Sequence, residues 1–312
     1  MRKYQDAVRL PAPPPARCVA TAGPARLLQH GAENGRSPVV FIPSLINSPR
    51  VLDLSESRSL LRHMAATGHD AHLVDWGAPT PQDAALGLDG HVTERLLPLL
   101  ATLPRPPILV GYCLGGSLAL GAASMAAIPA VATIAAPWHF DAFPLADLKL
   151  IGGLWNGARA LSERIGSVPM EVLQSGFWAM DPARTIRKYA AFAGMEAGSD
   201  AEHAFLAVED WANGGAPLTY AAGRDLFDHF YAANVSGRGQ WRIDGRTVDP
   251  SAFDCPTLSI VSTTDRIVPA AAGPRLREER SLSLGHVGMV VGSRARETLW
   301  EPLSHWLSSQ GG

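Results

Sequence analysis

The most informative segment of this chain is Pro107-Ile108-Leu109-Val110-Gly111-Tyr112-Cys113-Leu114-Gly115-Gly116-Ser117-Leu118-Ala119-Leu120. A short apolar run ends in Gly-x-Cys-x-Gly-Gly and continues directly into small residues with helical spacing. A strand, a sharp turn and a helix in this order predict a nucleophile elbow, which exposes one reactive side chain at the end of a buried strand. Cysteine occupies the position that serine usually holds, and a helix N-terminus favours its thiolate. We therefore expect Cys113 to be a covalent nucleophile.

The residues on either side of Cys113 fit this geometry. Gly111 and Gly115 leave room where a Cβ atom would collide with the neighbouring strand and helix. Leu114 directly follows the nucleophile, so its backbone N–H would point from the helix N-terminus toward a developing oxyanion. The segment thus predicts the α/β-hydrolase fold, in which helices flank a mostly parallel sheet.

The loop after the first buried strand is the place where this fold supplies a second oxyanion donor. The apolar run Val39-Val40-Phe41-Ile42 predicts that strand, and Leu45 and Ile46 follow it. We expect their backbone N–H groups to complete the oxyanion hole. Asn47, in the same loop, is either a substrate-binding side chain or a turn-forming residue.

An acid and a histidine follow Cys113 in the order that the fold requires. Asp265 comes just after the predicted strand 256–262, and His286 lies in a glycine-flanked loop after the predicted strand 280–283. Asp75 also ends a predicted strand, but it precedes the nucleophile, so we expect a structural role for it. The sequence therefore predicts a catalytic triad of Cys113, Asp265 and His286.

Three other residues are weaker candidates for substrate binding. Tyr112 precedes the nucleophile, and Trp138 and His139 follow the predicted strand 130–135. His139 is interpreted as a residue at the hinge of an insertion more readily than as a base. Neither Tyr112 nor Trp138 receives a more specific role.

Composition narrows the class of protein. The chain has 312 residues, of which 46% are hydrophobic and 18% charged, which is typical of a well-buried globular protein. A net charge of −2 argues against nucleic-acid binding, and no apolar run is long enough to span a membrane. The sequence shows no secretory signal. The three cysteines, Cys18, Cys113 and Cys255, are widely separated and suggest neither a disulfide framework nor a metal site. We expect a cytoplasmic protein.

The pattern divides the chain into three parts. Residues 1–24 are rich in proline and alanine and predict an extended arm. Residues 25–137 and 251–312 predict the hydrolase core, and residues 138–250, rich in helical pattern and aromatic residues, predict an inserted helical lid. An apolar stripe within the insertion is either core packing or the inner face of that lid, and it comprises Leu226, Phe227, Phe230 and Tyr231. Two glycine-bearing segments, 151–153 and 213–215, are candidate hinges of the lid.

These motifs resemble polyhydroxyalkanoate (PHA) synthases. The resemblance covers roughly residues 25–307 and is strongest around the triad, in Gly111-Tyr112-Cys113-Leu114-Gly115-Gly116, Asp265-Arg266-Ile267-Val268-Pro269 and Gly285-His286-Val287-Gly288. The segments 205–211 and 227–231 resemble the catalytic chain of the two-subunit, class III type. The resemblance places the family's catalytic cysteine, aspartate and histidine at Cys113, Asp265 and His286.

The resemblance implies an acyltransferase that uses 3-hydroxyacyl-CoA as substrate, forms an acyl-cysteine, releases CoA, makes poly(3-hydroxybutyrate)-like polymer and needs no cofactor. It also implies a PHA granule surface and a homodimer or second synthase subunit as partners. Two departures, Arg266 in place of a histidine and Leu45 in place of a tryptophan, favour a second hypothesis, a cysteine hydrolase of thioesters or esters. A non-catalytic granule-associated protein is the third, and a complete triad argues against it.

Overall fold

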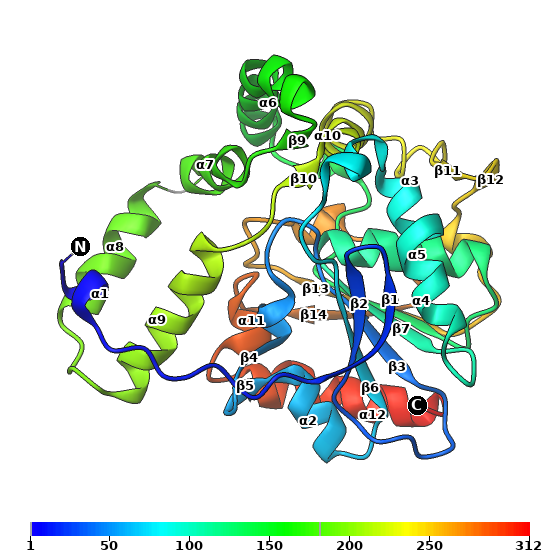
Figure 1. Ribbon diagram of the computed structural model, residues 1–312, viewed down its shortest axis with the longest axis horizontal. Helices are drawn as coiled ribbons and strands as arrows, with labels where there is room; N and C mark the ends of the chain where they lie inside the picture. Colours follow the sequence, from blue (N-terminus) through cyan, green and yellow to red (C-terminus); the bar gives the residue numbers. More distant parts are fainter. Residues whose placement is uncertain (1, 181) are drawn as a thin grey trace.

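An eight-stranded sheet forms the centre of the computed structural model, which describes residues 2–180 and 182–312 (Figure 1). Strands β6, β3, β7, β8, β13 and β14 run parallel, and β2 and β1 add an antiparallel hairpin at one edge. In sheet order the strands are β1 (Arg17–Ala22), β2 (Ala25–Gln29), β6 (Ala71–Asp75), β3 (Val39–Ile42), β7 (Ile108–Tyr112), β8 (Val131–Ile134), β13 (Thr257–Ser262) and β14 (Glu278–Leu282).

The central strands are short apolar runs that are buried on both faces, as expected for a parallel sheet. Every residue of β3, β7, β8 and β13 is buried. Their register places Ile42 beside Gly111, and Gly111 beside Thr133. The carboxyl ends of β3, β7 and β8 therefore meet at one edge of the sheet, where the loops that carry the candidate site begin.

Helices cover both faces of the sheet. One face packs against α3 (Leu88–Gly90), the π-helical segment His91–Leu96, α4 (Leu97–Ala101) and α5 (Leu114–Met125). The other packs against α2 (Leu60–Ala66), α11 (Gly288–Val291), the π-helical segment Arg296–Trp300 and α12 (Glu301–Ser309). A small hairpin of β4 (Asp53–Ser55) and β5 (Arg58–Ser59) precedes α2. This layered arrangement agrees with the expected architecture.

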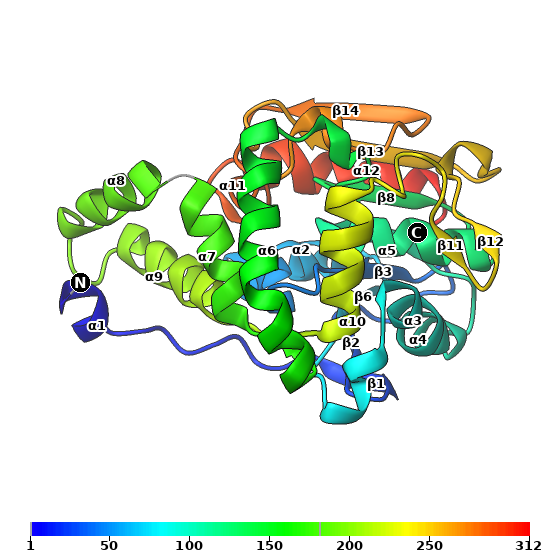
Figure 2. The same cartoon turned by 90° about the horizontal axis from the view of Figure 1, so that it is seen from above.

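The insertion between β8 and β13 is helical, and α6–α9 form an extension beside the core (Figures 1 and 2). Its helices are α6 (Leu145–Ile165), α7 (Met170–Met180), α8 (Pro182–Ala193), α9 (Asp200–Asn213), α10 (Tyr220–Arg224) and the π-helical segment Asp225–Ala232. The insertion also contains two short antiparallel strand pairs. β9 (Ser167–Val168) pairs with β10 (Leu218–Thr219) on either side of α7–α9, and β11 (Arg242–Ile243) forms a hairpin with β12 (Arg246–Thr247) after the last of these helices.

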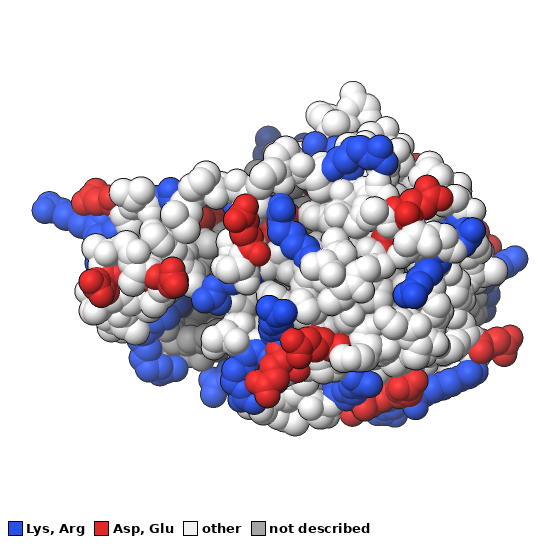
Figure 3. Space-filling model, turned by 90° about the horizontal axis from the view of Figure 1, so that it is seen from below, with Lys and Arg blue, Asp and Glu red and all other residues white. Residues whose placement is uncertain are grey.

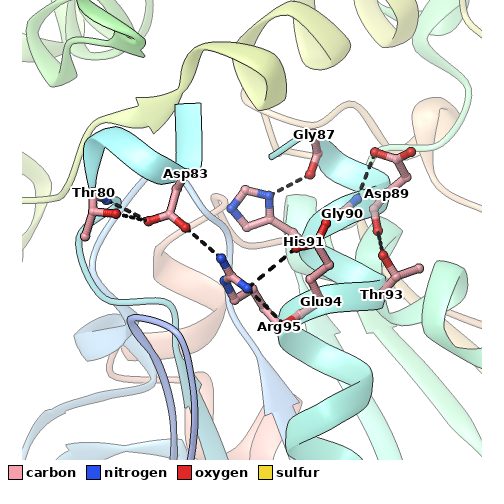
Figure 4. A network of polar contacts seen from close by, with 9 residues as sticks. All are labelled: Thr80, Asp83, Gly87, Asp89, Gly90, His91, Thr93, Glu94 and Arg95. Atoms are coloured by element: carbon pink, nitrogen blue, oxygen red, sulfur yellow. Dashed lines mark hydrogen bonds and ion pairs between the residues drawn. The ribbon is translucent and has the colours of Figure 1, made fainter. Parts of the chain in front are cut away.

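The inner half of the insertion is anchored on the loop that follows β6. Asp225 Oδ2 accepts a hydrogen bond from the Leu88 N–H at 3.0 Å, and Thr219 Oγ1 donates to the Leu86 carbonyl at 2.6 Å. A polar network stiffens this loop, because the Asp83 carboxylate accepts from the Thr80 N–H and from Arg95 (Figure 4). Residues 216–232 are thus fixed to the core.

The prediction of an extended arm over residues 1–24 is wrong at both ends. Residues 2–6 form the helix α1 (Arg2–Asp6), and residues 17–22 form β1. Tyr4 of α1 packs edge-on against Tyr189 and donates a hydrogen bond to Asp210, so contacts with α8 and α9 stabilise this helix. Strand β1 forms because β2 would otherwise present unpaired backbone groups at the edge of the sheet.

Candidate active site

Cys113 lies on a strained turn between β7 and α5. Its φ of 54° and ψ of −133° are sparsely populated for a residue with a side chain. A Cβ atom on Gly111 would lie 2.3 Å from the Gly116 Cα, and one on Gly115 would lie 2.1 Å from the Ile42 carbonyl oxygen. Only glycine fits at these two positions, which is the reason for the motif.

Among the expected oxyanion donors, Leu114 directly follows Cys113, and Ile46 lines the same cavity as Cys113. Leu114 is the first residue of α5, and the N–H groups of a first helical turn have no partner within the helix. In the loop after β3, the Ile46 N–H lies 3.2 Å from the Ser44 hydroxyl oxygen, while the Leu45 side chain packs into the core. These backbone positions are compatible with an oxyanion hole, and their role belongs to the proposal below.

Asp265 and His286 form a buried pair at the ends of the neighbouring strands β13 and β14. His286 Nδ1 lies 2.6 Å from Asp265 Oδ2, and the two side chains are 6% and 0% exposed. The other carboxylate oxygen, Oδ1, accepts hydrogen bonds from the N–H groups of Ile267 at 2.8 Å and Val268 at 3.0 Å. The loop after β13 therefore fixes the carboxylate, and the carboxylate fixes the imidazole ring.

The charge state of His286 follows from its neighbours. Burial alone would lower the pKa of the ring, but the charge and hydrogen bond of Cys113, together with the carboxylate of Asp265, raise the pKa to about 10. At neutral pH the ring is therefore protonated on both nitrogens, and the N–H that does not face Asp265 faces the sulfur. This arrangement suits a thiolate–imidazolium pair.

Tyr112 positions the histidine. Its hydroxyl group donates a hydrogen bond to the His286 carbonyl oxygen at 3.2 Å, and the two rings lie 5.1 Å apart. Burial, followed by the charges of Cys113 and Asp265, raises the pKa of Tyr112 well above its usual value. The sequence predicted a weak substrate-binding role for Tyr112. The side chain lines the cavity beside Cys113 and also supports the backbone of the His286 loop.

A cavity of about 200 Å³ opens above Cys113 and His286. Its floor comes from the core and comprises Pro43, Ser44, Ile46, Asn47, Ser48, Val51, Tyr112, Cys113, Arg266, Ile267, His286 and Val287. Its roof comes from α7, α8 and α9 of the insertion and comprises Gln174, Thr185, Lys188, Val208, Glu209, Trp211 and Ala212.

The structure brings some of the weaker candidates to the cavity and leaves others outside it. Asn47 lines the cavity and donates a hydrogen bond to the Gly214 carbonyl oxygen at 3.4 Å, which connects the floor to the insertion. Trp138 is buried in the core, with its ring 6.0 Å from that of Trp241. His139 donates its backbone N–H to Ala272. Neither Trp138 nor His139 is among the residues that line the cavity.

Sequence reasoning missed the polar residues of the roof, Lys188 and Glu209 above all. Glu209 lies within the segment 205–211 that carried the family resemblance, which is the one signal that could have found it. In the part of the chain that the structure describes, no three His, Cys, Asp or Glu side chains are grouped to hold a metal ion. Likewise, no described helix is long and apolar enough to cross a membrane.

Comparison with known proteins identifies relatives along most of the chain, although no family model matches it. The poly(3-hydroxyalkanoate) polymerase subunit PhaC of Haloferax mediterranei is 28% identical over 296 residues, which are 88% of this chain and 59% of the relative. The same subunit of Thiocystis violacea is 26% identical and is covered over 83% of its length, and that of Synechocystis is 27% identical and covered over 78%. The chain is therefore similar to PhaC subunits over most of its length.

The chain spans about 60% of the length of its haloarchaeal relatives. Solved structures show the fold. A thermophilic esterase from Thermogutta terrifontis aligns with a TM-score of 0.53 at 14% identity, covering 98% of this chain and all of the other. The ring-cleaving AqdC variant aligns with a TM-score of 0.57 at 16% identity, covering 94% of this chain and 98% of the other. The predicted α/β-hydrolase fold is confirmed.

Proposed function

We propose that the chain is a PHA synthase-like acyltransferase that acts on 3-hydroxyacyl-CoA through a covalent acyl-cysteine. The observation that carries the proposal is the buried Asp265–His286 pair beside a cysteine on a nucleophile elbow. Homology to PhaC subunits supports an acyl-CoA thioester as the substrate.

In the first half-reaction the Cys113 sulfur attacks the thioester carbonyl. The new S–C bond forms as the bond to the CoA sulfur breaks, and the protonated His286 gives its proton to the departing CoA thiolate. The N–H of Leu114, with those of Leu45 and Ile46, stabilises the oxyanion between these two events. One thioester replaces another, so the acyl group stays activated.

In the second half-reaction the neutral His286 takes the proton of an attacking hydroxyl group, whose oxygen forms a new C–O bond to the acyl carbon as the S–C bond breaks and Cys113 leaves as a thiolate. Asp265 stabilises the imidazolium that forms. A hydroxyl group of a second hydroxyacyl unit or chain end extends a polymer, whereas water releases the free acid. The product therefore depends on which of the two reaches acyl-Cys113, and the roof over the cavity controls that access.

A cysteine hydrolase of thioesters or esters is the second candidate. Arg266 favours it, because a charged side chain among the cavity-lining residues keeps water close to the acyl-cysteine. The third hypothesis, a non-catalytic granule-associated protein, has no support from the site, since a fixed and buried Asp265–His286 pair serves no purpose in a scaffold.

The proposal also concerns location and partners. We assign the chain to the cytoplasm and, when polymer is present, to the surface of a PHA granule. Three apolar side chains of α6, Leu145, Leu161 and Ile165, are more than half exposed and support this assignment. On the face shown in Figure 3, basic and acidic side chains are interspersed, which gives nucleic acid no basic stripe to bind. We also propose that the chain forms a homodimer or binds a second synthase subunit.

Incubation of the purified protein with 3-hydroxybutyryl-CoA tests the proposal. Released CoA, polymer and free 3-hydroxybutyrate are quantified in one reaction, with Cys113→Ala as the control. We expect CoA release that depends on Cys113 and yields polymer. Release that yields only free acid would establish the hydrolase instead, and release equal to that of Cys113→Ala would contradict both.

A further inference from the structure

The roof of the cavity contains an ion pair with a buried carboxylate. Lys188 Nζ of α8 lies 2.8 Å from Glu209 Oε1 and 2.7 Å from Oε2 of α9. Glu209 is only 5% exposed, and both side chains line the cavity into which Cys113 and His286 point. A buried charge is costly unless it is paired, and a pair of this kind often costs more than apolar packing would.

Attachment of α8 to α9 does not require this pair. The rings of Phe192 and Phe205 stack 4.4 Å apart, and Tyr189 packs edge-on against Phe205 at 5.5 Å. These aromatic contacts already join the two helices by apolar burial. The ion pair lies on the cavity side of the same helices, so its position is explained better by a ligand than by packing.

Neighbouring groups hold Glu209 in place. The Tyr189 hydroxyl group contacts its carboxylate, and burial, followed by the charge and hydrogen bond of Glu209, raises the pKa of Tyr189 to about 12. Helix α9 is fixed to the floor by the Trp211 indole N–H, which donates to the Ser48 carbonyl oxygen at 2.8 Å. The carboxylate is therefore pre-organised before any substrate enters.

The chemistry of the pair defines its ligand. The ammonium group has three donors, and the two short contacts to Glu209 leave a third, while the carboxylate retains free acceptor sites. A hydroxyl group both donates and accepts, so it can bond to both members. Because the pair has no net charge, it favours a neutral ligand over an anion. Gln174 and Thr185 add further polar groups to the roof.

We propose that Lys188 and Glu209 bind the hydroxyl group of the hydroxyacyl substrate and select it over an unsubstituted acyl thioester. This inference rests on the proposed acyl transfer to Cys113 and deepens it by naming specificity-determining residues. An acyl chain without the hydroxyl group leaves the buried pair unsolvated and without a ligand, and sites built to hydrogen-bond a hydroxyl group reject such analogues strongly.

Acylation of Cys113 by 3-hydroxybutyryl-CoA and by butyryl-CoA tests the proposal, with the ratio of the two kcat/KM values as the readout. In the wild type we expect a preference for the hydroxyacyl substrate on the order of 10-fold to 100-fold, the effect of one hydrogen bond to a charged group. The double variant Lys188→Met/Glu209→Leu removes both charges at once, so it leaves neither buried alone. It should lose the preference, because its rate falls with the hydroxyacyl substrate and not with butyryl-CoA.

The matched control is Lys3→Met/Glu202→Leu. This Lys–Glu pair, at 3.4 Å, also involves α9 but lies two turns earlier and does not line the cavity. Its substrate ratio should equal that of the wild type. Should the roof double variant not fold, as judged by thermal melting, the isosteric Glu209→Gln makes the same test and should reduce the ratio.

Four results would overturn the inference. They are a wild type without preference, a roof variant that keeps the wild-type ratio, a variant that loses rate equally with both substrates, and a control that loses the ratio as well. An equal loss of rate with both substrates would indicate that the pair contacts the CoA portion that the two substrates share. Absence of Cys113 acylation with either substrate in the wild type is a different result, and it would contradict the proposed function itself.

Discussion

The floor and the roof of the cavity are built from different kinds of structure. On the floor, Cys113, Asp265 and His286 follow the ends of strands of one sheet. Backbone hydrogen bonds hold Cys113 and Asp265, and the Asp265 carboxylate holds His286. The roof consists of α7, α8 and α9. Aromatic rings pack α8 against α9, and α9 reaches the core through contacts such as Trp211 to Ser48. In the proposed function, the floor carries the chemistry and the roof decides what reaches it.

The same contrast divides the insertion itself. The π-helical segment Asp225–Ala232 belongs to the main core, with Phe230 only 1% exposed and packed against Phe140 and Trp241. Asn234 and Ser236 bond to the backbone of Phe140 and Trp138. Of the two interpretations of the apolar stripe, the burial of Phe230 favours core packing, and residues 152 and 153 lie within α6. We confine the lid proposal to α7–α9.

The largest effect should come from the floor. Asp265→Asn removes the acceptor that fixes the His286 tautomer, so we expect kcat to fall by a factor on the order of 10²–10⁴ with the fold intact. The matched control is Asp75→Asn, since Asp75 also ends a strand and is paired with Arg26. Steady-state CoA release measures both. A harmless Asp265→Asn together with an inactive Asp75→Asn would show that the acid is wrongly assigned.

Phe230→Ala tests whether the inner half of the insertion contributes to the stability of the core more than the roof does. Because it removes a fully buried ring, we expect the free energy of unfolding to fall by about 3–5 kcal/mol. Ile186→Ala on α8, where the side chain is 72% exposed, should change it by less than about 0.5 kcal/mol. Urea denaturation measures both variants. Similar losses for the two would contradict the division drawn here.

Trp211→Ala tests whether the roof controls access of water. The indole ring lines the cavity and ties α9 to the floor, so its loss should raise the ratio of free acid to polymer, by up to about tenfold if ~1.4 kcal/mol of discrimination disappears. Total CoA release should fall less than polymer yield. Trp211→Phe, which keeps an aromatic ring, should remain closer to the wild type. An unchanged ratio of free acid to polymer in folded Trp211→Ala would show that the roof does not control the access of water to acyl-Cys113.

A smaller effect is expected in the pH dependence of the free energy of unfolding. Burial is the main cause that lowers the pKa values of His30, His69, His72 and His91, so the folded chain holds these rings neutral. In the unfolded chain they titrate near pH 6.5, so below that pH the unfolded state binds more protons and stability falls, by up to about 1.4 kcal/mol per pH unit for each group. His286 has the opposite sign: its contribution is complete below pH 6.5 and is lost as the pH rises through about 10.

Urea midpoints at pH 7.5 and pH 5.5 measure the acid effect. The wild type should be less stable at pH 5.5, and His72→Gln should reduce the difference between the two pH values. A wild-type midpoint that does not change between them would contradict the burial of neutral histidines.

The floor was predictable because its signals are local. Gly111, Cys113 and Gly115 are close in sequence, so the elbow can be read from one segment, and Asp265 and His286 follow from the strand order of the fold. Their geometry in the structure, with a 2.6 Å contact between acid and histidine, agrees with that reading.

The roof and the N-terminal segment were not predictable in the same way. Tyr4 meets Asp210, and Lys3 meets Glu202, across about 200 residues of chain. No periodicity or motif records such pairings, because they depend on how the insertion packs. The two residues of the roof pair lie on separate helices, and only the packing of α8 against α9 brings them together.

The central claim is that Cys113 carries the acyl group, and mass spectrometry tests it most directly. The protein is mixed with 3-hydroxybutyryl-CoA, quenched in acid within the first turnover and digested, and the peptide that contains Cys113 is analysed. The account predicts a mass increase of one hydroxybutyryl group on Cys113, accompanied by one equivalent of CoA and absent from Cys113→Ala. CoA release with no acyl group on Cys113, or with one on Cys18 or Cys255 instead, would contradict it.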